Sequence, residues 1–509
     1  MKATRDLLTG VLNSVWSALV GFAVVPLYLK YLGIEAYGLI GFFATTQALL
    51  QLLDMGIAPT INREVARHGA LGKTHEAGPL LHTLTWIYCG VAAAIGLASF
   101  LLAPWVATHW LHSSALDPKA LSDSVALLGL VVACRWPIGL YQGVLLGTHR
   151  LALSSGLNMA MVTLAAAGAV AILAFVSPTI QAFFLWQAAM GLLYALAMRQ
   201  AAWRALGAGA RAQFELDEVK RVWRFSAGMS GVAISAIVLM QLDKVLLSRI
   251  LPLEGFGQYA LAGVVASALY ILLTPTFNVI YPRLSGWVAQ GRDDEVQRLY
   301  RSGTRMLTCV LFPIAAGASV FSYELLLVWT RNATVAAHSA PVVSLFLIGT
   351  ALNGAMHFPY ALQLAHAQTR LPLTINAILL VVLVPLTTVL ALHYGAIGGA
   401  ASWAVLNTIY LLVGTALTHR VFLRGTGMSW LTHDVLLPLV ASALVVGLVG
   451  NAIHALPVSP IAMLALAAVL VAGCAMSLLA FTPDTRRIVQ QLLFSRADGP
   501  VVPVVGRSR

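Results

Sequence analysis

Long apolar stretches alternate with short polar connections along almost the whole chain. Fourteen of these stretches are about 20 residues long, the length that an α-helix needs to cross the hydrocarbon core of a bilayer. This pattern predicts an all-α integral membrane protein with about fourteen transmembrane helices. The predicted helices cover residues 7–29, 34–58, 78–103, 121–146, 151–176, 179–199, 226–249, 256–282, 306–329, 340–365, 371–392, 396–418, 433–454 and 460–481.

The composition agrees with the apolar pattern. The chain has 509 residues, of which 59% are hydrophobic and 10% are charged, whereas soluble domains carry about 25% charged residues. The cysteines all lie in apolar stretches without metal-ligand spacing, so we interpret them as buried, small hydrophobic residues. They are Cys89, Cys134, Cys309 and Cys474.

The basic residues are distributed unevenly between the two sides of the predicted membrane protein. If the N-terminus is cytoplasmic, 25 of the 31 lysines and arginines lie on the cytoplasmic side, and only Lys30, Lys119 and Arg331 lie outside. Such an excess is typical of cytoplasmic loops, so both termini are predicted to be cytoplasmic. The net charge of +12 therefore reflects topology, and we predict no nucleic-acid partner. The first stretch is longer than the apolar part of a signal peptide, so we expect it to be retained.

Three matches in the same order reveal an internal repeat. They pair residues 31–38 with 250–257 at an offset of 219, 135–137 with 357–359 at 222, and 150–154 with 370–374 at 220. An even number of helices separates equivalent points, so the halves should have the same orientation. We predict two six-helix bundles related by a pseudo-two-fold axis along the membrane normal, a parallel repeat that is typical of transporters. Two further C-terminal helices lie outside the repeat.

The repeat gives the predicted domain organisation. An N-terminal bundle covers residues 1–205, a cytoplasmic linker 206–225, a second bundle 226–420, the last two helices 433–481 and a cytoplasmic tail 482–509. Two connecting stretches are amphipathic, and two interpretations stay open for each: a helix on the inner membrane surface, or a solvated, charged linker. These stretches are residues 215–224 and 292–305.

Standard catalytic signatures are missing from the sequence. It contains no phosphate-binding Gly-Lys-Ser/Thr loop, no His-Glu-x-x-His motif and no Gly-x-Ser-x-Gly motif, the patterns that mark common nucleotide, zinc and serine-nucleophile sites. We therefore predict a protein that is not an enzyme and that has no cofactor and no metal site. Transport would therefore not be powered by an ATP site in this chain.

Ionisable residues inside the predicted helices are the best candidates for a functional site, because each is costly when it faces lipid. Arg135 lies near the middle of its helix, and the repeat makes His357 its equivalent. Arg135 could face a ligand or a wet cavity, or it could form a structural ion pair. Asp243 and Lys244 lie toward the outer leaflet. Neighbouring residues on a helix point in different directions, so we expect at least one of them to line a cavity.

Polar residues also form stripes on the repeat-related helices. One stripe contains Gln47, Gln51 and Asp54; the others contain Tyr270, Thr274, Asn278 and Tyr281, and Asn353, His357 and Tyr360. Such stripes can be interhelical hydrogen bonds, but their recurrence favours a shared water-filled cavity. The predicted substrate-binding residues are Arg135, His357, Lys244, Asp243, Gln51, Gln142, Tyr270, Asn278, Asn353 and Tyr360.

Several motifs resemble the polysaccharide transporter family. They are Asn13 in a long first helix, Val25-Pro26 through Gly33, Tyr37-Gly38, Leu53-Asp54-Met55-Gly56 before a basic loop, Gln241 through Ser248, Gly257-Gln258-Tyr259, and Gly395 through Ala401. The individual motifs are loose, but their order and spacing are fairly specific over residues 10–420. The family includes O-antigen flippases and belongs to the superfamily of multidrug, oligosaccharidyl-lipid and polysaccharide exporters.

The resemblance implies a flippase in the bacterial inner membrane that works by alternating access, and coupling to a proton or sodium gradient is expected for the superfamily. Its substrate would be an undecaprenyl-pyrophosphate-linked oligosaccharide, and its other partners would be membrane lipids, a polysaccharide polymerase and a chain-length regulator. Cations can hold a pyrophosphate, and amide and aromatic side chains suit sugars. Two alternatives stay open, namely a cation-coupled multidrug or toxin exporter of the same superfamily and a non-transporting subunit of a polysaccharide assembly complex. A membrane glycosyl-polymerase or ligase would need a larger outer loop than this chain has.

Overall fold

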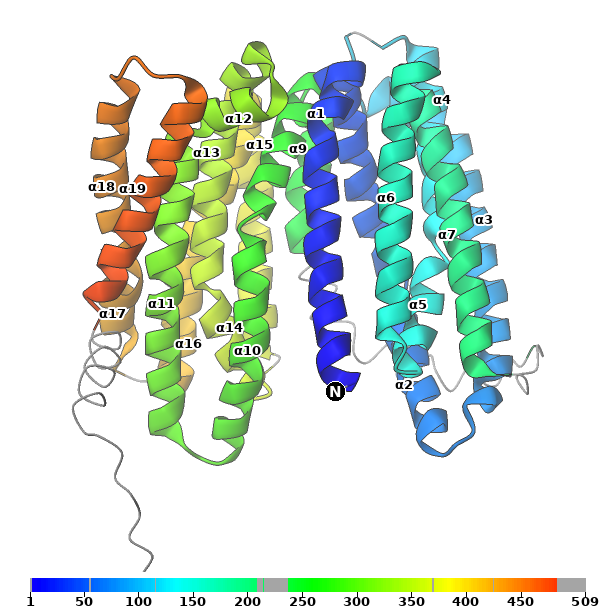
Figure 1. The fold of residues 1–509 in the computed structure, drawn as a ribbon, viewed down its shortest axis with the longest axis horizontal. Coiled ribbons are helices and arrows are strands. Elements are labelled where there is room, and N and C mark those ends of the chain that lie inside the picture. The colour runs from blue at the N-terminus through cyan, green and yellow to red at the C-terminus, as the bar shows by residue number, and fades with distance from the viewer. Residues whose placement is uncertain are drawn as a thin grey trace, which may run out of the picture. The chain divides into compact units, whose positions relative to one another are not determined.

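The computed structural model describes residues 2–207, 214 and 237–482, except residues 55, 115, 369 and 424. All elements assigned in these ranges are helices (Figure 1), apart from one isolated backbone bridge between His112 and Pro252. Ten described helices are long and apolar enough to cross a membrane, or eleven if the bent pair 253–267 and 270–289 forms one span. The chain is therefore an all-α, multi-pass membrane protein, as predicted.

The helices follow one another closely along the chain. The first part contains α1 (Lys2–Leu50), η1 (Gln51–Asp54), α2 (Ile57–Ala70), η2 (Thr74–Ala77), α3 (Gly78–His109), α4 (Pro118–Arg135), α5 (Ile138–Gly147), α6 (Leu151–Phe175), α7 (Ile180–Leu206), a helix described from residue 237 to 250, and α9 (Leu253–Ser267). The second part contains α10 (Tyr270–Ala289), α11 (Asp293–Val320), α12 (Ser322–Thr330), α13 (Ala333–Ala355), α14 (His357–Ala365), α15 (Arg370–Ile409), η3 (Tyr410–Gly414), α16 (Thr415–Phe422), α17 (Gly427–Ser429), η4 (Trp430–Leu436), α18 (Leu437–His454) and α19 (Pro460–Ala480).

Two of the long helices each contain two predicted spans. The backbone leaves helical geometry at Gly33 in α1 (φ 78°) and at Gly395 in α15 (φ 59°). A positive φ strains residues that carry a Cβ but not glycine, so glycine allows the chain to turn there between two helices. With these kinks, each of the fourteen predicted spans contains a helix or consecutive helical segments, although the span 226–249 is described only from residue 237.

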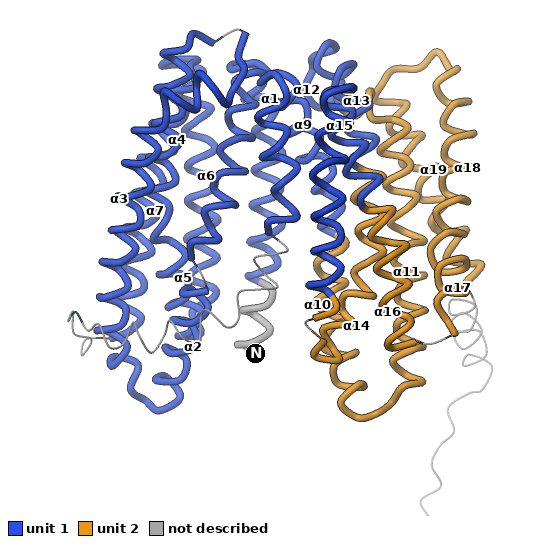
Figure 2. The backbone as a smooth tube through the Cα atoms, turned by 180° about the vertical axis from the view of Figure 1, so that it is seen from behind, with its two compact units in different colours: residues 1–271, 326–346, 372–406 blue, residues 272–325, 347–371, 407–509 orange. Residues whose placement is uncertain are grey.

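The chain packs into two compact units, coloured separately in Figure 2. Unit 1 contains residues 1–271, 326–346 and 372–406, and unit 2 contains residues 272–325, 347–371 and 407–509. These units are defined by packing, whereas the predicted bundles at 1–205 and 226–420 are defined by the repeat, so the bundles stay a prediction. The predicted linker 206–225 lies almost entirely outside the described residues, as does the tail after residue 482.

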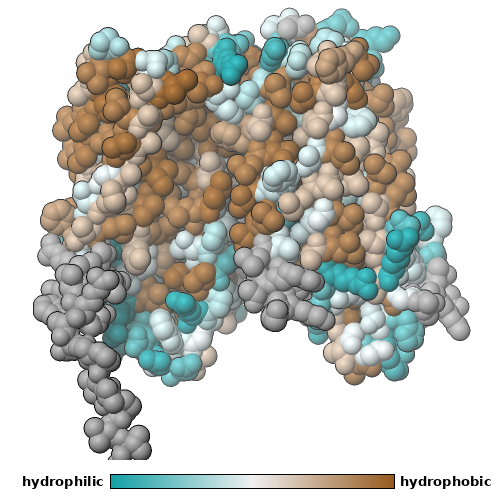
Figure 3. All heavy atoms as spheres, in the orientation of Figure 1, coloured by the Kyte–Doolittle hydropathy of each residue, from teal (hydrophilic) through white to brown (hydrophobic). Residues whose placement is uncertain are grey.

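Each unit has an apolar interior and an apolar exterior. In unit 1, α2, α3, α5 and α7 bury a cluster that includes Ile61, Leu81 and Val144. Large apolar side chains such as Phe100 and Phe175 are at least two-thirds exposed, and Figure 3 shows apolar residues over the middle of the helices with polar residues gathered toward their ends. Without a lipid environment this exterior would be unfavourable, so it is the lipid-facing surface.

Several predicted spans are interrupted at repeat-equivalent positions. The helix that carries Arg135 breaks between α4 and α5, and the helix that carries His357 breaks between α13 and α14. A proline follows two residues after each of these side chains, where it removes a backbone N–H and disfavours a continuous helix. A second equivalent pair is the 3-10 turn that begins at Gln51 and the 46° bend that precedes Tyr270. Broken helices of this kind build substrate sites in transporters.

A reciprocal glycine contact joins two repeat-equivalent segments inside unit 1. A Cβ at Gly38 would overlap the carbonyl oxygen of Leu253, and a Cβ at Gly257 would overlap the carbonyl oxygen of Ile34. Both Ile34 and Leu253 and the two glycines are 219 residues apart. A two-fold relation produces this pattern, in which each segment contacts its partner through the same residues. The contact therefore supports the predicted pseudo-two-fold repeat.

This contact gives a stability prediction. Gly257→Ala should destabilise the protein by about 1–3 kcal/mol, because the added methyl group meets a backbone atom that has no rotamer to change. Gly263→Ala is the matched control on the same helix: nothing lies within 4 Å of its Cβ position, so it should be neutral or slightly stabilising. Thermal unfolding of the two purified variants measures the difference, and equal melting temperatures would contradict the close contact.

The amphipathic stretch 292–305 differs from both interpretations of its sequence. It forms the first turns of α11, a continuous helix that begins at Asp293. Arg301 and Arg305 turn inward and bind the fully buried carboxylate of Asp434, with Arg301 Nε 2.9 Å from Oδ2 and Arg305 Nε 2.8 Å from Oδ1. The stretch is therefore the start of a long helix and not a linker; Arg301 and Arg305 are neutralised by a distant carboxylate, whereas Arg292 and Arg298 are exposed and pair with Glu295.

Candidate functional site

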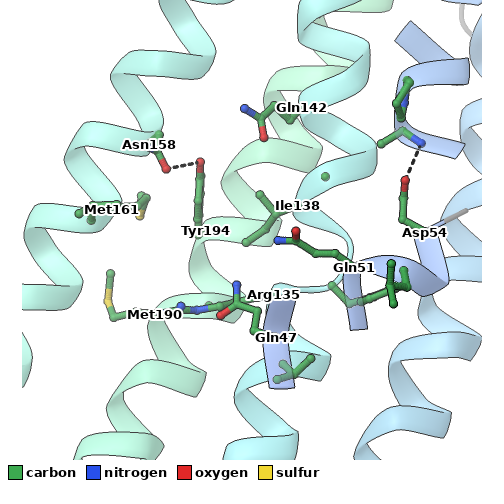
Figure 4. Close-up of a pocket in the computed structure, with 18 of the residues that line it drawn as sticks. Gln47, Gln51, Asp54, Arg135, Ile138, Gln142, Asn158, Met161, Met190 and Tyr194 are labelled. Carbon is green, nitrogen blue, oxygen red and sulfur yellow. Dashed lines mark hydrogen bonds between the residues drawn. The ribbon is translucent and has the colours of Figure 1, made fainter. Parts of the chain in front are cut away.

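Unit 1 contains a cavity of about 680 Å³, a volume in the range of small-ligand sites. Its walls come from both sides of the helix breaks described above, namely α1, η1, α2, α4 and α5, and from α6, α7 and Ile237. Figure 4 shows its polar side chains around one space. Those polar side chains are Gln47, Gln51, Asp54, Thr60, Arg135, Gln142, Asn158 and Tyr194.

Arg135 lies at the C-terminal end of α4, where the helix dipole favours a cation. Its Nη2 donates a hydrogen bond of 2.6 Å to Oε1 of Gln187, and its guanidinium lies 5.5 Å from the centre of the Phe43 ring. Among the described residues, no carboxylate forms an ion pair with it. Arg135 therefore lines the cavity with its charge uncompensated, and the structural ion pair that the sequence left open is not formed within the described chain.

The carboxylate of Asp54 also lines the cavity, but both of its oxygens have partners. Oδ1 accepts a hydrogen bond from the Tyr88 hydroxyl, and Oδ2 accepts one from the backbone N–H of Ala58 in the first turn of α2. Asp54 thus caps a helix N-terminus, a position that stabilises a carboxylate. Its role in this arrangement is to hold α2 and α3 together.

Asn158 and Tyr194 form a polar network across three helices. The Asn158 amide donates to Asn13 Oδ1 (2.8 Å) and to Ser17 Oγ (3.2 Å), and the Tyr194 hydroxyl donates to Asn158 Oδ1 (3.1 Å). The network satisfies the Asn158 amide and fastens α1, α6 and α7 together on one side of the cavity. The role of Asn13 in this network is structural, because its side-chain oxygen accepts a hydrogen bond from Asn158.

Three amides in the cavity wall have no such partner. Gln47, Gln51 and Gln142 make no hydrogen bond to another described residue. Each amide offers two N–H donors and one acceptor oxygen, so together with Arg135 they can bind an anion and hydroxyl groups. The structure thus brings the predicted residues Arg135, Gln51 and Gln142 together in one cavity.

Unit 2 brings together another predicted set. His357 lies edge-on to Phe277, with ring centres 6.1 Å apart, and the ring of Tyr360 stacks on Phe277 at 5.9 Å. The Asn353 amide donates to Asn407 Oδ1 at 2.9 Å, which gives it a structural bond of the kind that polar stripes often provide. Asn278 lies on α10 near this group and is exposed. Whether these side chains bind substrate stays a prediction.

The remaining predicted residues lie away from the unit 1 cavity. Asp243 is 1% exposed and accepts a 2.5 Å hydrogen bond from the Tyr259 hydroxyl. Lys244 donates to the carbonyl oxygen of Met240, and its Nζ lies 3.6 Å from Asp243 Oδ1. The two neighbours have different surroundings, since the side chain of Lys244 is 30% exposed and that of Asp243 is 1% exposed, and that one of them lines a cavity stays a prediction. Tyr270, at the start of α10, does not line the cavity either.

Three residues in or beside the cavity were not predicted from the sequence, namely Gln187, Asn158 and Tyr194. Gln187 and Tyr194 are seven residues apart on α7, and Asn158 faces them from α6. A polar residue at intervals of seven along an apolar helix marks one face, so this signal was present. At the repeat offset of 220, Gln187 corresponds to Asn407, so part of the signal recurs in the other half of the chain.

An internal repeat, broken helices and a polar cavity within apolar helices define a class, the multi-pass membrane transport proteins. More specifically, the chain belongs to the family described as "Polysaccharide biosynthesis protein", whose model matches residues 4–287. The matched segment includes all residues that line the cavity of unit 1.

The chain is similar in sequence to two curated proteins. The chain is 22% identical over 414 residues to the putative O-antigen transporter of Shigella flexneri, covering 77% of this chain and 94% of that protein. It is 23% identical over 323 residues to the succinoglycan biosynthesis transport protein ExoT of Rhizobium meliloti, covering 62% of this chain and 60% of that protein.

Solved structures share the fold at low sequence identity. An inward closed conformation of the lipid II flippase MurJ has a TM-score of 0.71 and 12% identity, covering 95% of this chain and 100% of that chain. An inward-facing multidrug resistance transporter of the MATE family has a TM-score of 0.64 and 11% identity, covering 79% of this chain and 95% of that chain. These likenesses concern the fold alone.

Proposed function

We propose that this protein is a flippase that moves an undecaprenyl-pyrophosphate-linked oligosaccharide across the bacterial inner membrane by alternating access. The observation that carries the proposal is the uncompensated charge of Arg135 in a cavity whose other available polar groups are amides. A planar guanidinium suits a pyrophosphate, because its N–H groups can bind two oxygens at once. The amides of Gln47, Gln51 and Gln142 suit sugar hydroxyls, which both donate and accept.

The relatives favour the same substrate class. One curated relative is named a putative O-antigen transporter and the other a succinoglycan biosynthesis transport protein, and the lipid II flippase MurJ has the same fold. In the proposed orientation both termini are cytoplasmic, as the distribution of basic residues indicates. Labelling by an impermeant thiol reagent from outside the membrane tests the orientation: a cysteine introduced at Ser114 should react, and one at Gln290 should not.

A multidrug exporter is the second candidate, and the fold of the MATE family transporter favours it. Exporters of organic cations need an available carboxylate in the cavity, since opposite charges attract strongly at low dielectric. The carboxylate in the unit 1 cavity is Asp54, whose two oxygens are bound to Tyr88 and Ala58. These neutral partners leave Asp54 its negative charge but occupy both of its oxygens, whereas Arg135 makes one hydrogen bond, keeps further N–H donors for a ligand and would repel a cation. The electrostatics of this cavity therefore favour the anionic substrate.

A deletion strain separates the two candidates. Loss of this protein should remove a surface polysaccharide and make its lipid-linked repeat units accumulate on the cytoplasmic side, because their synthesis continues while their export stops. Lipid extraction and mass spectrometry measure the accumulation, and complementation by the wild-type gene should reverse it. Normal surface polysaccharide together with increased sensitivity to cationic drugs would favour the multidrug exporter.

A further inference from the structure

Gln187 lies behind Arg135 and does not line the cavity. It lies on α7, is 7% exposed, and its Oε1 accepts the 2.6 Å hydrogen bond from Arg135 Nη2. One turn further along α7, Gly191 leaves room for the arginine: a Cβ there would lie 2.9 Å from Arg135 Cγ. Gln187 and Gly191 together form a slot on α7 that fixes the direction of the guanidinium.

The surroundings of Arg135 fix its position without cancelling its charge. The ionisable side chains that influence it are Tyr28, Cys134 and Tyr194, all of which are ordinarily neutral near pH 7. Phe43 offers the face of its ring, which attracts a cation but carries no net charge. Glutamine offers an acceptor oxygen on a neutral amide, and glutamate has nearly the same shape with a full negative charge.

We infer that Gln187 is the positioning residue that determines the charge selectivity of the cavity: it anchors Arg135 while leaving the whole positive charge available to an anionic group of the substrate. This inference rests on the proposed function and deepens it. A carboxylate at position 187 would hold the guanidinium in the same place and would neutralise it. The neutral amide is therefore what makes the cavity attractive to a pyrophosphate.

The test uses the purified full-length protein in lipid nanodiscs and farnesyl diphosphate as the probe, with farnesol as the uncharged comparison. Calorimetry measures both affinities for each variant. The wild-type protein should prefer the diphosphate, and Gln187→Glu should lose about tenfold or more of its affinity for it, as expected for removal of a charge-assisted hydrogen bond. Gln187→Met keeps the positive charge but loses the anchor, so its loss should be smaller. Gln200→Glu, on an exposed face of the same helix, is the control for added charge and should bind as the wild type does.

The outcomes separate the inference from the proposed function. A wild-type protein that binds farnesol and farnesyl diphosphate equally would overturn the anion site itself and the inference with it. A wild-type preference for the diphosphate that survives unchanged in Gln187→Glu would overturn the inference alone, since a purely structural glutamine tolerates an isosteric acceptor. If Gln187→Glu fails to fold, the affinity of Gln187→Met for farnesyl diphosphate tests the inference instead. An affinity equal to that of the wild-type protein would overturn the positioning role of Gln187.

Discussion

Replacing Arg135 by alanine is expected to reduce export about ten- to a hundredfold while the amount of protein in the membrane stays near normal. The variant loses the charge-assisted hydrogen bonds to the pyrophosphate, each worth about 1.5–3 kcal/mol. Folding should suffer little, because removing an uncompensated cation from the interior also removes its desolvation penalty. The release of intact lipid-linked oligosaccharide to the outer leaflet, normalised to protein abundance, measures the effect.

Arg135→Lys should retain part of the export activity. The charge survives, but the single ammonium group cannot reproduce the planar fork that binds Gln187 and two anion oxygens together. Arg249→Ala is a matched control, since Arg249 also lies over an aromatic ring, that of Trp110, but belongs to the exposed end of another helix. Disappearance of the Arg135→Ala protein from the membrane would indicate a structural role instead, and normal export by a stable variant would exclude substrate binding.

Asp434→Ala is expected to destabilise unit 2 by about 3–5 kcal/mol. Asp434 is 0% exposed, and its carboxylate binds two arginines from α11. Removing one member of a buried ion pair is strongly destabilising, because it leaves an uncompensated charge in the protein interior. Here Arg301 and Arg305 would both lose their counter-ion, while the hydrogen bonds from Trp430 to Thr304 and from Thr308 to the backbone carbonyl oxygen of residue 434 would remain between η4 and α11. Thermal or denaturant unfolding in detergent measures the loss.

Glu295→Ala provides the matched control for Asp434→Ala. Glu295 also pairs with two arginines, Arg292 and Arg298, but its side chain is 27% exposed and its partners are more than half exposed. Exposed pairs of this kind contribute about 0–1 kcal/mol, so the control should unfold near the wild-type temperature. Equal effects of the two substitutions would mean that water reaches Asp434, and the buried triad would then contribute nothing special to stability.

Much of this protein could be predicted from local patterns. An apolar stretch of sufficient length has few alternatives to a helix in a bilayer, because every backbone polar group must be satisfied within the chain. The repeat placed Arg135 and His357 at equivalent positions, and both indeed lie where a helix breaks. Arg135 was recognised because a permanent charge near the middle of such a helix requires an explanation.

Partners distant in the sequence could not be predicted in this way. Hydropathy shows that residues 292–305 are amphipathic, but it does not show that Arg301 and Arg305 find a carboxylate more than 120 residues later. The sequence placed Asp54 in a polar stripe and Asp243 among the predicted binding residues, yet it did not show that tyrosines from other helices bind both of them. Hydrogen bonds between helices depend on which faces meet, and helical periodicity alone does not determine that.

The sequence by itself determined the membrane-spanning helices, the internal repeat and the presence of an arginine deep within a span, because helix length, self-similarity and the cost of a buried charge are properties of residues in order along one chain. Only the tertiary structure decided which charges remain available. Arg135 keeps its full charge because α7 presents a neutral glutamine to it, whereas the charge of Arg305 is balanced by Asp434 and both oxygens of Asp54 already accept hydrogen bonds. Electrostatic energy falls with distance, so the chemistry of the cavity depends on side chains that only folding brings within a few ångströms of one another.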